Sequence, residues 1–111
     1  MKFSYPAEKF SVARSNLMLP HSNGEASSIA HAFHECSLGL HELDRDELEE
    51  VAADWVRKLE ELMDTTGIAD PDERGTFAVR AEQLSVDQKI ELSRIIDELA
   101  HWFERENRDE F

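Results

Sequence analysis

An apolar side chain recurs at every third or fourth position between residues 46 and 65, and no other feature constrains the fold as strongly. A repeat of 3.6 residues places such side chains on one face of an α-helix. The stripe comprises Leu48, Val51, Ala52, Trp55, Val56, Leu59, Leu62 and Met63. We expect Asp44 or Asp46 to cap the start of this helix and Gly67 to follow its end. The pattern therefore predicts an amphipathic helix with one face in a core.

Residues 6–18, 25–40 and 86–105 also show helical spacing of apolar side chains, and Ser85 with Gln88 forms a capping-box pattern before the last of them. The first segment places Ala7, Phe10, Arg14, Leu17 and Met18 on one side. The core stripes of the other two are Ile29, Phe33, Cys36, Leu40, Leu92, Ile95, Ile96, Leu99 and Phe103. The expected fold class is mainly α, a small four-helix bundle-like single domain over residues 1–111.

The connection between residues 67 and 84 is long for a helical bundle. Residues 76–81 alternate apolar and polar side chains as a strand does, and residues 2–5 alternate in the same way. We therefore include a short two-stranded β ribbon, formed by residues 2–5 and 76–81, as an optional element of the predicted fold. Such a ribbon would hold the long connection against the bundle.

The charge of the chain restricts its partners. Asp and Glu number 25 against 12 Lys and Arg, which gives a formal net charge of -13. An acidic surface repels phosphate backbones and anionic membranes and attracts basic protein surfaces. We therefore expect a basic protein partner, with no direct binding of nucleic acid or membrane. The alternative explanation of the charge is plain solubility.

Cys36 is the single cysteine, so no internal disulfide can form, and this is typical of a reducing compartment. No apolar stretch has the length of a signal peptide core or of a membrane-spanning helix. We therefore expect a cytoplasmic protein.

The densest group of reactive side chains is His31, His34 and Glu35, followed by His41. On a helix they share the face opposite the core stripe, whereas Cys36 points toward the core. His31 with Glu35, or His31 with His34, has a spacing that can grip one metal ion. The HExxH zinc motif is absent, and a closed site needs further ligands from another element. We therefore assign no metal and no other cofactor.

We interpret His31, His34, Leu38 and His41 as a protein contact face, and a homodimer is one form that this contact can take. These residues carry little charge at neutral pH and therefore suit an interface centre, which is depleted in charge. Because His titrates near neutrality, the contact would be sensitive to pH. The alternative is a set of ordinary exposed histidines. Ile90, which lies opposite Leu92 on its helix, is a candidate for a second contact.

Catalytic signatures are few, because the sequence contains no Gly-x-Ser-x-Gly elbow, no P-loop and no GxGxxG. Arg14 and His21, with six residues between them, resemble the Arg-x(4–6)-His signature of HEPN ribonucleases. The sequence departs from that signature at Ser15, where a polar Asn, Asp or His is usual, and at Pro20. It also carries the pair near its N-terminus rather than in a late helix. The resemblance implies a small helical protein whose motif Arg and His act on RNA at a dimer interface.

The sequence thus predicts a non-enzymatic, acidic protein-binding accessory or regulatory protein, of the antitoxin, immunity or inhibitor kind. No catalytic residue is assigned. The alternative from a different class is a small helical enzyme, either metal-dependent or a HEPN-like ribonuclease.

Overall fold

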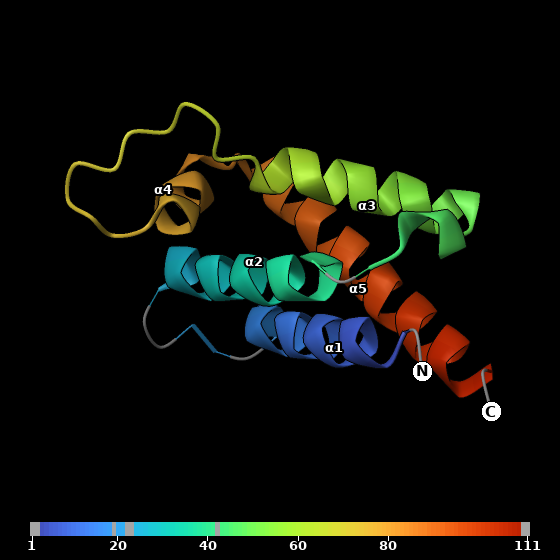
Figure 1. Cartoon of the computed structure of the whole chain (residues 1–111). Helices are drawn as coiled ribbons and strands as arrows, with labels where there is room; N and C mark the ends of the chain where they lie inside the picture. Colours follow the sequence, from blue (N-terminus) through green and yellow to red (C-terminus); the bar gives the residue numbers. More distant parts are fainter. Residues whose placement is uncertain (1–2, 19, 22–23, 42, 110–111) are drawn as a thin grey trace.

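The computed structural model describes residues 3–18, 20–21, 24–41 and 43–109, and these ranges form helices and their connections without a strand (Figure 1). The helices are α1 (Ser4–Met18), α2 (Glu25–His41), α3 (Glu50–Met63), α4 (Thr76–Gln83) and α5 (Val86–Asp109). A 3-10 turn, η1 (Arg45–Glu47), precedes α3. The predicted helical fold class is confirmed. No helix among the described residues has the length and apolar character needed to cross a membrane.

The predicted β ribbon is wrong. Residues 76–81 lie in α4, and Ser4 and Tyr5 lie in α1; Lys2 is outside the described residues. The alternation in α4 instead places Phe77 and Ala81 one helical turn apart on the side that faces the core. Ala81 is buried, and the ring of Phe77 lies 5.7 Å from that of Phe33 on α2. Six residues are too few to distinguish a strand from one buried side of a short helix.

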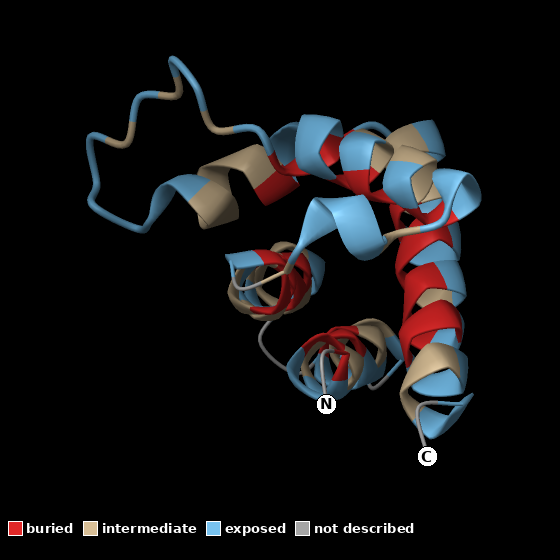
Figure 2. Cartoon of the chain, turned by 45° about the vertical axis from the view of Figure 1, so that its right-hand side comes forward, coloured by how far each residue is buried: buried red, intermediate tan, exposed pale blue. Residues whose placement is uncertain are grey.

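The longest helix, α5, supports the others. The helices α1 and α3 pack along it, α2 packs on α1, and α4 packs on α2 (Figure 1). The buried sides of α1, α2, α3 and α5 face a common interior (Figure 2). Among the described residues every buried large side chain is apolar, and no polar or charged residue is buried. Burial of apolar surface therefore drives the fold.

The helices α1 and α2 approach each other closely at Gly39, which is buried. A Cβ at this position would lie 3.1 Å from the Cβ of Lys9 and 3.2 Å from the ring of Phe10. These distances are shorter than an ordinary van der Waals contact of about 3.5–4.0 Å. Glycine therefore allows α1 to lie against α2 at this point. Ala32, also fully buried, lies two turns earlier on the same side of α2.

The starts of α3 and α5 test two capping predictions. The helix α3 begins at Glu50, later than expected, because Asp44 caps η1 instead and accepts a hydrogen bond from the Asp46 amide at 3.0 Å. The capping box is confirmed, since the Ser85 hydroxyl and the Gln88 side chain accept from each other's backbone amides at 3.1 and 2.9 Å. The helix prediction placed this second boundary correctly because the capping signal was local in sequence.

Gly67 does not cap α3. The helix ends at Met63, and Gly67, with a φ of 75°, lies in a turn that the Ile68 amide closes on the Thr65 carbonyl. The last carbonyls of α3 are instead satisfied from α4. The Arg80 guanidinium donates to the Leu62 carbonyl at 2.8 Å and to the Glu61 carbonyl at 3.4 Å. A cation at this end also complements the helix dipole.

We expect Arg80→Ala to lower the free energy of unfolding by about 1–2 kcal/mol, because carbonyls at the end of α3 lose a charged donor. The matched control is Arg57→Ala on α3, whose side chain is 63% exposed and pairs with Asp54. That exposed pair is worth about 0.5 kcal/mol or less. Chemical denaturation of both variants measures the difference. Equal losses in the two variants would contradict a capping role for Arg80.

Candidate functional site

The predicted contact face lies on the outer side of α2. His31, His34 and His41 are exposed, and Leu38 is half-buried in their middle. The helical projection therefore describes these side chains correctly. Glu35 departs from it, because its side chain is 22% exposed and its carboxylate lies 3.6 Å from the Lys9 ammonium on α1. Packing of α1 thus covers one edge of the face that the sequence assigned to solvent.

This packing also removes Glu35 from the histidines as a metal ligand. Within the described ranges no three His, Cys, Asp or Glu side chains are arranged to hold a metal ion. His101, the histidine on α5, bonds through its ring to the Asp97 carbonyl at 2.9 Å. The chelating pairs suggested by the spacing of His31, His34 and Glu35 are therefore not extended by a ligand from another helix.

Arg14 and His21, the residues that resemble the HEPN signature, have separate partners. The Arg14 Nε lies 2.5 Å from the Asp97 carboxylate on α5. His21 Nδ1 lies 2.8 Å from the Ser28 hydroxyl at the start of α2. The structure records no contact between Arg14 and His21. Arg14 acts as a link between α1 and α5, which is a structural role for the residue that the resemblance singled out.

Cys36 is fully buried in the core. Burial, and to a lesser degree the neighbouring Glu35 carboxylate, raise the pKa of its thiol far above the usual range. The reactive form of cysteine is the thiolate. Cys36 is therefore a small apolar core residue, as its position on the helical stripe indicated.

We expect Cys36 to resist alkylation by maleimide in the folded protein and to react in denaturant. The residue is the single cysteine, so the number of labels per chain is a direct readout. Mass spectrometry should find the unlabelled chain under native conditions and one label per chain when the protein is unfolded. Fast labelling of the native protein would contradict the buried position.

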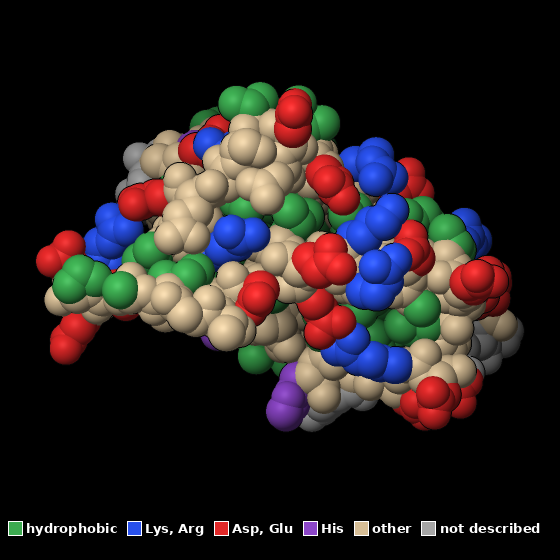
Figure 3. All heavy atoms as spheres, turned by 90° about the horizontal axis from the view of Figure 1, so that it is seen from above, with side chains coloured by type: hydrophobic (Ala, Val, Ile, Leu, Met, Phe, Trp, Pro, Cys, Tyr) green, Lys and Arg blue, Asp and Glu red, His purple; other side chains and the backbone are tan. Residues whose placement is uncertain are grey.

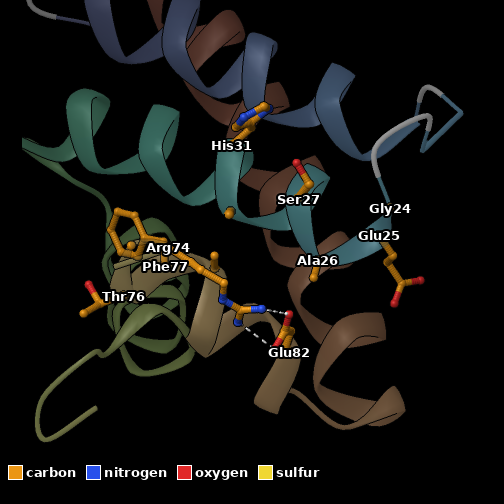
Figure 4. Close-up of a pocket in the computed structure, with 12 residues that line it drawn as sticks. Gly24, Glu25, Ala26, Ser27, His31, Arg74, Thr76, Phe77 and Glu82 are labelled. Atoms are coloured by element: carbon orange, nitrogen blue, oxygen red, sulfur yellow. Dashed lines mark hydrogen bonds and ion pairs between the residues drawn. The ribbon is translucent and has the colours of Figure 1, made fainter. Parts of the chain in front are cut away.

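A hollow of about 790 Å³ lies between the start of α2 and the segment from Arg74 to Glu82 (Figure 4). The guanidinium of Arg74, which lines the hollow, donates two 2.8 Å hydrogen bonds to the Glu82 carboxylate. This pairing raises the pKa of Arg74 and lowers that of Glu82. The His31 ring points away from the pair (Figure 4). The hollow thus offers small side chains of α2 and a neutralised cation.

Two carboxyl groups meet where the start of α3 approaches the end of α5. Partial burial, together with a hydrogen bond and repulsion from Glu49, raises the pKa of Glu106, and Asp109 adds to the repulsion. Arg105 opposes the shift. A raised pKa means that the folded state binds this proton more tightly than the unfolded chain. The contribution of Glu106 to stability therefore improves as pH falls through the raised pKa and is constant below the ordinary value.

We expect Glu106→Gln to raise the free energy of unfolding at neutral pH, by less than about 1 kcal/mol because solvent screens the pair. The gain should disappear below the ordinary glutamate pKa, where both proteins are uncharged at this position. Glu98→Gln, on an exposed position of the same helix, controls for the general effect of removing one negative charge. Equal gains in the two variants would show that Glu49 has no special effect on Glu106.

A groove of about 440 Å³ lies between the end of α1 and the middle of α5. Its lining is Arg14, Leu17, Met18, Ser93, Arg94, Ile96 and Asp97. The two helices run antiparallel here, because Phe3 packs on Trp102 with ring centroids 5.2 Å apart, whereas Leu17 and Met18 face Ser93 and Arg94. The groove has an apolar base, and the Arg14–Asp97 ion pair lies at its edge.

The most exposed large apolar side chains lie in or next to this groove. Met18 is 65% exposed, Ile90 is 64% exposed and Val86 is 70% exposed. Ile90 lies one helical turn before Ser93 and Arg94, and Val86 one turn before Ile90, so they continue the groove along α5. Single exposed apolar residues are common, whereas several close together are less usual on a protein surface. The lining residues, which include Met18, are called the α1–α5 groove together with Val86 and Ile90.

The sequence identified part of this surface. Ile90 was predicted to lie opposite Leu92 and is exposed, as that position requires. Met18 was placed on one side of its helix with Phe10 and Leu17, but it is the last residue of α1 and is 65% exposed. Val86 was predicted to begin a helix, and its exposed apolar side chain was not singled out. The missed signal is a second apolar position one turn before Ile90.

Comparisons with protein-family models, with curated proteins and with solved structures find no match to this chain. The fold and the groove therefore define its class directly: a small, acidic, all-helical domain with an exposed apolar groove between two antiparallel helices.

Proposed function

We propose that this chain is a non-enzymatic accessory or regulatory protein that binds a basic protein partner, in the manner of an inhibitor, immunity protein or antitoxin. The observation that carries the proposal is the α1–α5 groove, where Met18, Val86 and Ile90 expose most of their side chains. Burying apolar side chains of this size in an interface is worth about 1.5–3 kcal/mol each relative to exposure.

The distribution of charge supports a basic partner. The net charge of -13 produces a negative field that speeds encounter with basic surfaces and opposes encounter with nucleic acid. Figure 3 shows acidic and basic side chains interspersed on one face of the molecule. On α3, Asp54 forms ion pairs with Arg57 and Lys58. These pairs neutralise only part of the charge on α3, which carries four carboxylates against two basic side chains.

A reducing compartment such as the cytoplasm fits this role, because the single cysteine is buried and free of a disulfide. The histidine face of α2 supplies a second surface that a partner, or another copy, can contact. It is the weaker candidate, because its large apolar member, Leu38, is already half-buried.

The test is affinity purification of the tagged chain from its source cells at low and at high salt. We expect a basic protein in stoichiometric amount that is released as the salt concentration rises. The variant Ile90→Asp should lose this protein, since it places a charge in the exposed apolar surface.

Val51→Asp is the matched control, because Val51 is also an exposed β-branched apolar side chain, on α3 and away from the groove. It adds the same charge and should retain the partner. Recovery of the tagged chain alone, or equal recovery of a protein with Ile90→Asp, would overturn the proposal of groove-mediated binding.

A further inference from the structure

One side of α2 faces α4 and the two hollows on either side of α4. The hollow of about 790 Å³ contacts the first half of this side, and a cleft of about 340 Å³ contacts its end, where Met63 of α3 also lines the cleft. The residues of α2 on this side recur at intervals of four, three, four and three, which is the spacing of one helix face. They are Ala26, Ala30, Phe33, Ser37 and Leu40, and we call them the α2 seam.

Phe77 of α4 covers the middle of the α2 seam. Its ring lies 5.7 Å from that of Phe33, and the same residue lines both the hollow and the cleft. The helix α4 crosses α2 rather than running alongside it (Figures 1 and 2). Phe77 therefore separates the hollow from the cleft, and the two join along α2 when Phe77 moves away.

The helix α4 is held weakly. It has eight residues, of which Ala81 is buried and the others are exposed or half-buried. It packs mainly on α2, and Gly75 before it supplies no side-chain cap. A helix of about two turns is marginal on its own in water. Elements with few buried apolar contacts open at less free energy than the whole fold.

The connections on either side of α4 allow it to move as a unit. Residues 64–75, before it, are all exposed or half-buried, and a chain of this length spans up to about 40 Å when extended. After it, Leu84 is buried and Ser85 belongs to the capping box of α5, so this end is the point about which α4 can turn. The Arg74–Glu82 pair joins the end of the connection to α4 and moves with it.

We propose that α4 is a reversible cover over the α2 seam, and that its opening presents a site for an uncharged, apolar molecule. When α4 turns away, Phe77 leaves Phe33, and the hollow and the cleft form one site with a mainly apolar floor. Sites of this kind hold small ligands chiefly through apolar contacts. The α2 seam shares no lining residue with the α1–α5 groove, so this inference is independent of the proposed function.

Native-state hydrogen exchange of the full chain tests the opening, with each amide followed by NMR at urea concentrations below global unfolding. We expect the amides of α4 to be protected at least about tenfold less than the slowest amides of α5, with little dependence on urea, because local opening exposes little surface. The control is Ile95→Val, which removes a methylene group from a fully buried side chain of α5. It should speed the slowest α5 amides by about two- to tenfold and leave the α4 amides unchanged. Equal acceleration in both helices would mean that α4 opens only with the whole fold, and would overturn the proposal.

Two substitutions in α4 shift the opening in opposite directions. Phe77→Ala removes the ring that contacts Phe33 and should make the α4 amides exchange at least about tenfold faster. Thr76→Glu places an acid in the first turn of α4, which has none, and should slow these amides by about two- to fivefold.

Nile red, an uncharged apolar dye, is the probe for the uncovered site. We expect Phe77→Ala to bind the dye at least about threefold more tightly than the unsubstituted chain, and Thr76→Glu to bind it less tightly, in the order of their opening. Backbone NMR shifts caused by the dye in Phe77→Ala should lie on the α2 seam and on Met63. Equal dye binding by the two variants, or shifts confined to the α1–α5 groove, contradicts a cover role for α4.

Discussion

The fold depends on the apolar side of α5 and, within it, on the ring of Phe103. Rings of Phe10 and Phe3 from the α1 region lie 5.1 and 5.8 Å from it, and Trp102 lies 5.3 Å away. Aromatic rings at such distances add to the free energy of simple burial. This cluster fixes the position of α1 along α5, and α2 then packs on α1 through the close approach at Gly39. The rest of the bundle is assembled on this pair.

The same contact sets where the core stops. Because the aromatic cluster holds the start of α1 against the end of α5, the end of α1 lies beside the middle of α5, and the helix ends at Met18. The first two turns of α5 therefore extend beyond the end of α1, and Val86 and Ile90 on these turns are exposed. The exposed groove follows from the difference in length between a helix of 15 residues and one of 24. Apolar side chains at this place add little to the core, and the proposed binding role rests on them.

The sequence predicted those helices whose apolar stripe was long and whose caps were local. In the α3 stripe Ala52, Val56, Leu59, Leu62 and Met63 are core residues, whereas Val51 is exposed. The capping box located the start of α5. The short helix α4 was not predicted, because a few alternating residues do not distinguish a helix from a strand. Its helical state depends on packing against Phe33. The sequence analysis did not identify Gly39 and Ala32 as helix contact residues, since small side chains add little to a hydrophobic stripe. For the groove, periodicity identified Ile90 as outward, but the wall that α1 provides is a tertiary feature that no local pattern encodes.

The link from Arg80 to the end of α3 has a consequence for cooperativity. The long connection from residue 64 to residue 75 makes its own turns, with Asp70 accepting from the Arg74 and Gly75 amides at 3.0 and 2.7 Å. The helix α4 packs mainly on α2, so it has fewer tertiary constraints than the α1–α5 pair. An element held in this way opens as a local unit at less free energy than global unfolding requires. Because Arg80 belongs to that unit and caps α3, we expect local opening of α4 to loosen the last turn of α3 and to couple hydrogen exchange in the two segments.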